Sequence, residues 1–135
     1  MGYSKYGDTR RVLSSGRVTT MNDLEWSKAE KHAARKAYEL AYERECRTIR
    51  AKVDQMLADP TGDVRQIWRV HDYLSTKRRE TDKKYDYRYS VLIFVFARLI
   101  REGWITEDDL SGLGEDKKRK IRALLSFARG EEASS

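Results

Sequence analysis

The sequence is poor in cysteine, histidine and proline, and each shortage excludes a class of protein. Its one cysteine, Cys46, has no partner for an intramolecular disulfide, and two histidines are too few for a zinc-type ligand cluster. The longest apolar run, residues 91–97, is far shorter than the roughly 20 residues of a membrane span, and no signal-peptide pattern opens the sequence. We therefore expect a cytoplasmic protein with no structural metal, disulfide or membrane segment.

What is present is charge. Of the 135 residues, 37% are charged and 39% are hydrophobic, which suits one folded domain. Residues 1–20 hold four Lys and Arg residues against one Asp, which is half of the net charge of +6. We expect a disordered basic arm over residues 1–22, one helical domain over 23–130 and a flexible tail over 131–135. The near balance of the folded part argues against nucleic acid as a partner.

Helix signals dominate the middle of the chain. Ser27 and Glu30 have the spacing of a capping box, which predicts that a long helix begins there. Residues recur at steps of three and four down one apolar face until Pro60 and Gly62 end the helix; they are Ala34, Tyr38, Tyr42, Cys46, Ile49, Val53 and Met56, with Ala37 and Ala41 beside them. A helix of this length exceeds the width of a small compact domain, so a partner is expected to cover its far end.

The second half of the chain predicts four more helices. Asp63, with Gln66 as its reciprocal cap, is expected to begin the second helix. Residues 91–100 fit a buried strand or a buried helix, and we favour a helix because nothing else reads as a strand to pair with it. A short helix is expected from Thr106 to near Gly112, and a last one from residue 116 to residue 130.

The predicted fold class is therefore all-α, with a long antiparallel helical hairpin and a compact C-terminal helical head. The exposed stretch of the first helix favours a symmetric homodimer, in which each subunit buries the same surface.

Catalytic patterns are weak. His71 and Asp72, with His32 upstream and two acidic residues downstream, loosely resemble a metal-dependent phosphohydrolase, but the chain has too few helices to surround such a metal. The glycines at 112 and 114 lack the lysine and the serine or threonine of a phosphate-binding loop. We expect neither an enzyme nor a cofactor. Alternating tyrosines at residues 85, 87 and 89 could stack on bases, or could bury their rings against the helices.

The second predicted helix carries a candidate interaction surface. Trp68 lies in its apolar stripe beside several arginines, a combination enriched at binding hot spots. The stripe then turns polar, and Asp72, Lys77 and Arg78 could pair with acidic or basic residues of another helix across an interface. A solvated helix surface explains the same residues equally well, so both readings stay open at this point.

Several sequence strings carry a resemblance to a known family. They are residues 67–80 (IWRVHDYLSTKRRE), residues 84–91 (KYDYRYSV), residues 94–97 (FVFA) and residues 102–104 (EGW). Together they resemble the fluorescence recovery proteins of cyanobacterial photoprotection, over roughly residues 25–127. The first two strings are long and closely linked, which makes the resemblance specific.

The resemblance implies a dimeric, all-helical, non-enzymatic regulator without a cofactor. Members of the family bind the photoactivated orange carotenoid protein, chiefly at its C-terminal domain, and speed its return to the inactive orange form. They also help detach it from the phycobilisome, the antenna attached to the thylakoid. The family's patch for dimerisation and activity corresponds to Trp68, His71, Asp72 and Arg78, and a second contact region in the head corresponds to Phe94, Lys120 and Leu124.

The sequence also departs from the family pattern. The basic arm has no expected counterpart, Thr81 replaces an aliphatic residue, and Lys83 stands where glycine is common. These departures leave open a relative of the same fold that acts on another protein in a bacterium without the carotenoid protein. A small nucleic-acid-binding protein is the alternative from a different class.

Overall fold

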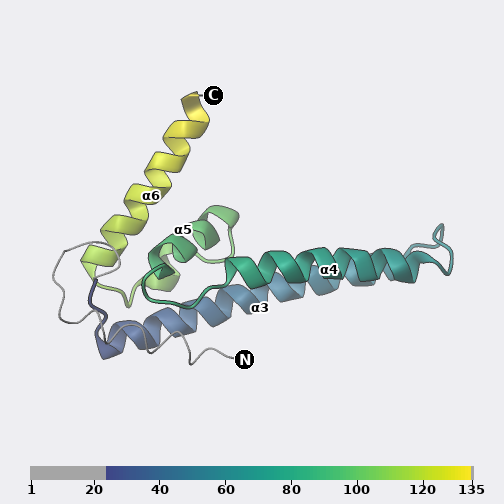
Figure 1. Ribbon diagram of the computed structural model, residues 1–135, viewed down its shortest axis with the longest axis horizontal. Coiled ribbons are helices and arrows are strands. Elements are labelled where there is room, and N and C mark those ends of the chain that lie inside the picture. The colour runs from purple at the N-terminus through teal and green to yellow at the C-terminus, as the bar shows by residue number, and fades with distance from the viewer. Residues whose placement is uncertain (1–23, 135) are drawn as a thin grey trace.

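A computed structural model describes residues 24–134, and every regular element within them is helical. The elements are α3 (Lys28–Ala58), α4 (Gln66–Lys84), α5 (Leu92–Glu102), the 3-10 helix η3 (Glu107–Leu110) and α6 (Glu115–Ser134). Helices α3 and α4 form a long antiparallel hairpin, and the other elements gather at one end of it (Figure 1). This confirms the all-α hairpin with a helical head. The arm expected over residues 1–22 lies outside the described residues.

Helix α3 begins with the expected capping box. The Ser27 hydroxyl oxygen accepts a hydrogen bond from the Glu30 amide at 3.1 Å, and the Glu30 carboxylate accepts one from the Ser27 amide at 2.9 Å. The helix ends at Ala58, just before Asp59-Pro60. Of the expected apolar face, Ala34, Ala37 and Ala41 are buried. Glu45 is buried beside them, whereas Tyr42 and Cys46 are exposed. Small alanine side chains let the head approach the helix closely, and this shifts the buried face away from the larger residues.

Helix α4 begins three residues later than expected. Asp63 does not cap it: the Asp63 carboxylate accepts the Arg65 amide at 2.8 Å in a turn that precedes the helix. The Gln66 side chain is not a reciprocal cap either, because its amide donates to the Met56 carbonyl at 3.2 Å across the hairpin. That bond satisfies one of the orphan carbonyls at the end of α3, so Gln66 ties the two helices together at the tip.

Helix α5 supplies much of the hydrophobic core, and the helix reading of residues 91–100 is confirmed. Gly103 ends it with a left-handed φ of 89°, and the Trp104 amide donates to the Leu99 carbonyl at 2.9 Å. This is the Schellman arrangement, which requires a residue that tolerates positive φ. The largest apolar side chains with almost no exposed surface come from α5, η3, α6 and their connections: Leu92, Ile93, Phe96, Leu99, Ile105, Leu110 and Ile121.

The segment between α4 and α5 is held on α3 by a row of aromatic rings. Neighbouring rings in this row have centroids 4.7–5.5 Å apart; in order they are Trp26, Tyr89, Tyr87, Tyr38, Tyr85 and Tyr42. The Tyr38 hydroxyl also donates to the Tyr85 carbonyl at 2.8 Å. Tyrosines 85, 87 and 89 thus lie in a connection rather than at a helix start, and their rings pack against α3. The packing reading of these tyrosines is the correct one.

The start of α6 is anchored to the start of α3. Lys117 is buried and its ammonium lies 3.1 Å from the Glu30 carboxylate, while the Gly114 amide donates to the other Glu30 oxygen at 2.6 Å. Although burial opposes ionisation, the hydrogen bonds from the Ser27 and Gly114 amides, together with Lys117, lower the pKa of Glu30. The preceding short helix is a single 3-10 turn, capped by Thr106 as expected. Helix α6 continues to Ser134, past the expected end at Gly130; flexibility of residues 131–135 stays a prediction.

Gly112 marks a close approach between the head and α3, and this makes a stability prediction. A Cβ at Gly112 would lie 2.5 Å from the Ala33 Cβ, so an alanine there forces the head away from the helix. We expect Gly112→Ala to lower the free energy of unfolding by about 1–3 kcal/mol in urea titrations. At Gly62, where a Cβ meets nothing nearer than 3.6 Å, the same change should be neutral or slightly stabilising. Equal effects at both positions would contradict the close-approach explanation.

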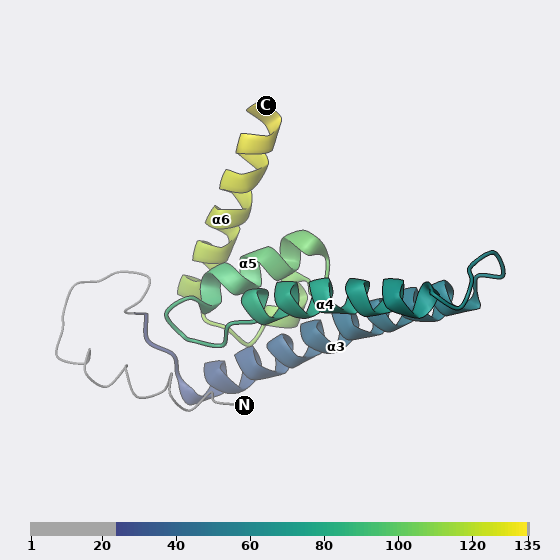
Figure 2. The same cartoon turned by 45° about the vertical axis from the view of Figure 1, so that its right-hand side comes forward.

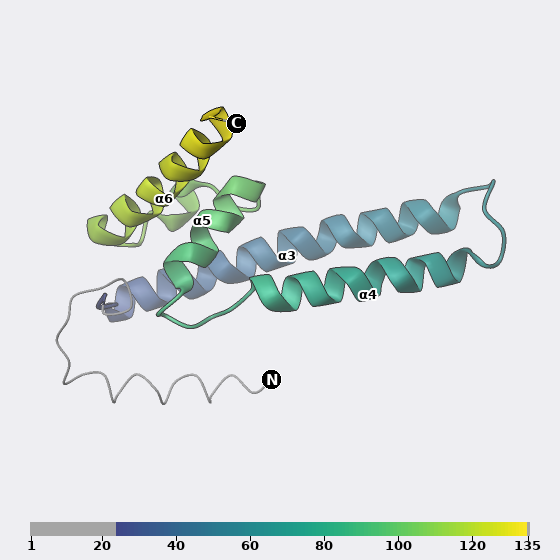
Figure 3. The same ribbon diagram turned by 45° about the horizontal axis from the view of Figure 1, so that its top comes forward.

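No helix of residues 24–134 covers the far half of the hairpin in any of the three views (Figures 1, 2 and 3). Figures 2 and 3 show α5 and α6 on the same end of the hairpin, with α3 and α4 side by side beyond them and α6 projecting from the body. Large apolar side chains are exposed on this far half, namely Leu57, Val64, Ile67, Trp68 and Leu74. An exposed apolar stripe rimmed by polar residues is typical of a protein interaction site.

Candidate protein-interaction surface

Four of the candidate residues lie along one face of α4, which we call the α4 face: Trp68, His71, Asp72 and Arg78. They are spaced at three to ten residues from Trp68, which keeps them on one side of the helix. All four are exposed, Trp68 to 61%. The Trp68 and His71 rings meet edge to face with centroids 6.3 Å apart, and His71 Nδ1 lies 3.3 Å from the Asp72 carboxylate. The arrangement presents an aromatic, a cationic and an anionic group to an approaching surface.

Arg78 lies at the other end of this face and pairs with Asp82 one turn later at 3.0 Å. The α4 face continues across the hairpin onto α3, where Tyr42 lies close to both residues. Burial above all, with the neighbouring Cys46 thiol and the Asp82 carboxylate, raises the pKa of the Tyr42 hydroxyl, and Arg78 opposes this shift. The periodicity of the first helix placed Tyr42 and Cys46 on its apolar face, and the structure adds that they are exposed and extend the α4 face.

Lys77 lies apart from the other candidates on α4. It is half-buried on the side of the helix that also carries Thr81 and Lys84, both of them buried. Its ammonium pairs with Glu80 at 3.3 Å and lies 5.8 Å from the centre of the Tyr73 ring. Lys77 therefore packs within its own helix instead of sharing a face with Trp68 and Arg78.

The head holds the remaining three candidates. Phe94 on α5 is exposed to 47%, whereas Lys120 and Leu124 on α6 are half-buried. Leu124 packs against the hydrophobic core, so only part of it is accessible. Trp68 lies in the first turn of α4, near the hairpin tip, and the head packs at the opposite end (Figure 1). The structure thus separates the candidates into two surfaces, one on the hairpin and one on the head.

A polar cluster built around the buried Lys84, Glu45 and Tyr85 joins the hairpin to the head, and sequence reasoning missed it. The Lys84 ammonium lies 2.8 Å from the Glu45 carboxylate and 2.6 Å from the Glu102 carboxylate. Glu45 also accepts the Tyr85 hydroxyl at 2.9 Å, and Glu102 accepts the Trp104 indole at 3.0 Å. We call these five residues the junction cluster. No local pattern marks them, because charged residues on a helix are usually solvated.

Titration properties follow from this packing. Burial opposes ionisation of Glu102, but hydrogen bonds from Lys84, Arg98 and Trp104 outweigh it and lower the pKa of Glu102 to about 2. Burial and the adjacent Glu45 carboxylate raise the pKa of the Tyr85 hydroxyl. Glu102 is therefore ionised at neutral pH, and the hydrogen bonds of the junction cluster fix how the head sits on the hairpin.

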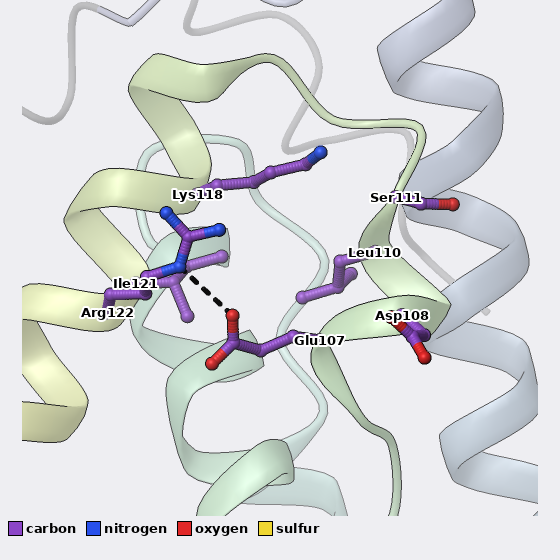
Figure 4. A pocket seen from close by; sticks show the side chains of 7 residues that line it. All are labelled: Glu107, Asp108, Leu110, Ser111, Lys118, Ile121 and Arg122. Carbon is purple, nitrogen blue, oxygen red and sulfur yellow. Dashed lines mark hydrogen bonds and ion pairs between the residues drawn. The ribbon is translucent and has the colours of Figure 1, made fainter.

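The head also has a shallow groove between η3 and α6. It has a volume of about 140 Å³ and is lined by Glu107, Asp108, Leu110, Ser111, Lys118, Ile121 and Arg122. Figure 4 shows Arg122 and Glu107 facing each other in an ion pair of 3.0 Å. The groove is smaller than the roughly 300–1,000 Å³ typical of small-molecule sites. We assign no ligand to it.

The loose resemblance of His71 and Asp72 to a metal-dependent phosphohydrolase finds no support in residues 24–134. Within that range, no group of three or more His, Cys, Asp and Glu side chains is placed to hold a metal ion. None of the helices there is both long enough and apolar enough to cross a bilayer. His71 and Asp72 are neighbours on an exposed helix surface rather than part of an enclosed site.

Comparisons with known proteins agree with the strings found in the sequence. A family model described as the photoprotection regulator fluorescence recovery protein matches residues 26–125. The fluorescence recovery protein of a Synechocystis strain is 44% identical over 99 residues, which are 73% of this chain and 90% of that protein. The solved structure of the Fremyella diplosiphon protein is 46% identical and has a TM-score of 0.68. That match covers 76% of this chain and 99% of the solved one. The Synechocystis structure is 42% identical at the same TM-score, and its match covers 74% of this chain and 97% of that one.

Proposed function

Because the chain belongs to the fluorescence recovery protein family of photoprotection regulators, we propose that it binds the photoactivated orange carotenoid protein. It contacts chiefly the C-terminal domain of that partner, accelerates its return to the inactive orange form and promotes its detachment from the phycobilisome. The observation that carries the proposal is the family match over residues 26–125, which includes both candidate surfaces. In the cell, this regulator works beside phycobilisomes attached to the thylakoid.

The mechanism needs binding and no bond chemistry. The regulator binds the transition state of the partner's recovery more tightly than it binds the photoactivated form, in which the partner's two domains are apart. This difference in binding lowers the activation barrier for recovery. The chain carries one of the candidate surfaces on the hairpin and the other on the head. Two separate surfaces suit a scaffold that holds two parts of the partner near each other. Such tethering raises their effective concentration and favours reassociation. Phe94, Lys120 and Leu124 form the head contact, and the α4 face forms the other.

We also propose that the chain is a symmetric homodimer over the single domain of residues 23–130. The exposed apolar residues of the far hairpin support this, because a two-fold contact buries the same stripe of both subunits. Trp68, His71, Asp72 and Arg78 lie along that stripe, so dimerisation and partner binding share residues.

The dimer makes a prediction about Trp68. Since Trp68 is a large aromatic at the centre of the proposed contact, Trp68→Ala should weaken the dimer at least tenfold and shift sedimentation toward the monomer. Phe127→Ala is the matched control, because Phe127 on α6 is a similarly exposed aromatic outside the stripe. A Trp68→Ala variant that sediments like the unchanged protein would place the dimer contact elsewhere.

The experiment for the function itself is the dark recovery of photoactivated orange carotenoid protein, followed by absorbance, with and without a stoichiometric amount of this chain. Faster recovery is the expected result. No acceleration by a folded, helical preparation would refute the proposal and favour a relative that acts on another protein. Capture experiments in the source cells would then identify that partner.

A further inference from the structure

The first turns of α3 carry a cluster of basic side chains, which we call the proximal basic face: Lys28, Lys31, His32, Arg35 and Lys36. All five are exposed. At about 100° per residue they occupy one side of the helix, turned away from the buried Ala34 and Ala37. The face is thus directed to solvent, on a different helix from the α4 face.

Ion pairing differs sharply between the two halves of α3. Farther along the helix, Arg44, Arg47 and Arg50 each pair with a carboxylate, provided by Asp109, Glu43 and Asp54 respectively. In the part of the chain that the structure describes, no carboxylate lies within 4.0 Å of the amines or guanidinium of the proximal basic face. Instead, Arg35 lies 3.9 Å from the centre of the Tyr87 ring and Lys31 lies 5.4 Å from that of Tyr89. These stacked side chains are positioned without being neutralised.

This arrangement is unfavourable for the fold itself. Like charges three and four residues apart repel on a helix surface, as in Lys28 with Lys31 and Lys31 with Arg35. Cations in the first turn also oppose the helix dipole. Contacts with the Tyr87 and Tyr89 rings offset part of this cost, but no carboxylate of the described residues neutralises the charge. A local rule broken in this way is typical of a functional surface.

The charge distribution along the chain concentrates at the same end. In residues 1–38, eight Lys and Arg residues face four Asp and Glu residues, whereas the rest of the chain has twenty against eighteen. Most of the net charge of +6 therefore belongs to the first quarter of the sequence, and the proximal basic face lies in the part of that quarter that the structure describes. Electrostatic steering toward a negative surface follows from such an asymmetry.

The residues around the proximal basic face indicate which kind of negatively charged partner fits it: nucleic acid, an anionic membrane or an acidic protein. Single-stranded nucleic acid binds by stacking bases on aromatic rings, but Arg35 already covers the Tyr87 ring. A phosphate backbone that follows the helix meets Glu39 and Glu43 within two turns. Binding to an anionic bilayer also needs exposed apolar side chains that insert into it. None of the large exposed apolar residues lies in this stretch of α3. A compact acidic patch on a protein fits all three observations.

We propose that the proximal basic face is a docking site for the acidic surface of a protein. It is separate from the α4 face and from the head contact, so it adds a third interaction surface to the chain. Rim charges of this kind mainly set association rate and salt dependence. The inference does not require the carotenoid protein to be the partner.

The test compares two charge-matched variants of the full chain. Lys28→Gln/Lys36→Gln removes two cations from the face, while Lys52→Gln/Lys83→Gln removes two exposed cations elsewhere on the hairpin. The probe is fluorescein-labelled poly-L-glutamate at low salt, with duplex DNA and phosphatidylglycerol vesicles as alternative probes. We expect the face variant to bind poly-L-glutamate about fivefold more weakly, and the control variant to bind like the unchanged protein.

Thermal unfolding gives a second readout. The face variant should unfold at the same temperature or slightly higher, because it relieves like-charge repulsion. Weaker binding without lower stability would support the docking site. Equal weakening in both variants, or no binding to poly-L-glutamate, would overturn it. Tighter binding to DNA or to vesicles, lost selectively in the face variant, would replace the acidic protein with that partner.

Discussion

Replacing Lys84 with methionine is expected to lower the free energy of unfolding by about 3–5 kcal/mol, because it leaves the buried Glu45 carboxylate without its cation. Lys84 and Glu45 are 5% and 8% exposed at their side chains, so water cannot replace the lost contact. Methionine keeps the length of the side chain and suits a helix, which confines the effect to the charge. Urea unfolding followed by circular dichroism, at one fixed protein concentration, measures the change.

Lys83 provides the control for this variant. It is exposed and adjacent on the same helix, so Lys83→Met should alter stability by no more than about 0.5 kcal/mol. A loss of less than 1 kcal/mol in Lys84→Met would show that the junction cluster does not depend on charge pairing.

The same cluster predicts a pH dependence. The folded pKa of Glu102 is about 2, below the ordinary value of 4.5, so the unfolded chain binds more protons between these values. Stability contributed by Glu102 is present above pH 4.5 and is lost as the pH falls toward 2. Because Lys84 causes much of this shift, the fall in stability should be shallower in Lys84→Met than in the unchanged protein. Parallel curves would contradict the assignment.

Replacing Arg78 with leucine is expected to reduce the acceleration of carotenoid-protein recovery by at least tenfold, about 1.4 kcal/mol of interaction free energy. Arg78 lies on the proposed contact beside Tyr42, and its pair with Asp82 is exposed. An exposed pair one turn apart contributes little to the fold, so unfolding should barely change. The measurement is the absorbance recovery rate over a range of protein concentrations.

Arg69→Leu is the matched control for Arg78→Leu. Arg69 is exposed, lies on the same helix, and is nine residues away, which places it on the opposite side of α4. It should retain the full recovery rate. If both variants lose activity equally, net charge rather than the α4 face carries the effect.

The sequence predicted the helices well where their signals are local. The capping box of Ser27, the stop at Asp59-Pro60 and the glycine after α5 depend on residues within one turn of each other. It was wrong about the start of α4, because Asp63 forms a turn with Arg65 before the helix begins. The same chemistry that caps a helix also stabilises a turn, and pattern alone does not separate the two.

The candidate surfaces were only partly predictable. Trp68, His71, Asp72 and Arg78 came from a long string shared with a family, and their three-to-four spacing places them on one face. Lys77 is separated from them because its helical position puts it on the side of α4 that carries the buried Thr81 and Lys84. The basic residues of the proximal basic face can be read from the sequence. Their lack of ion pairs cannot, because it depends on where the carboxylates of other elements lie in space.

By itself, the sequence determined an all-helical chain, its hairpin and its family, because caps, breakers, periodicity and shared strings are all read from neighbouring residues. The tertiary structure alone decided which face of α3 is buried and which charges are enclosed. Lys84 meets partners 39 and 18 residues away, and Gly112 meets Ala33 on another helix. Such contacts depend on how finished helices pack, since the burial of a charge is a property of its surroundings in space.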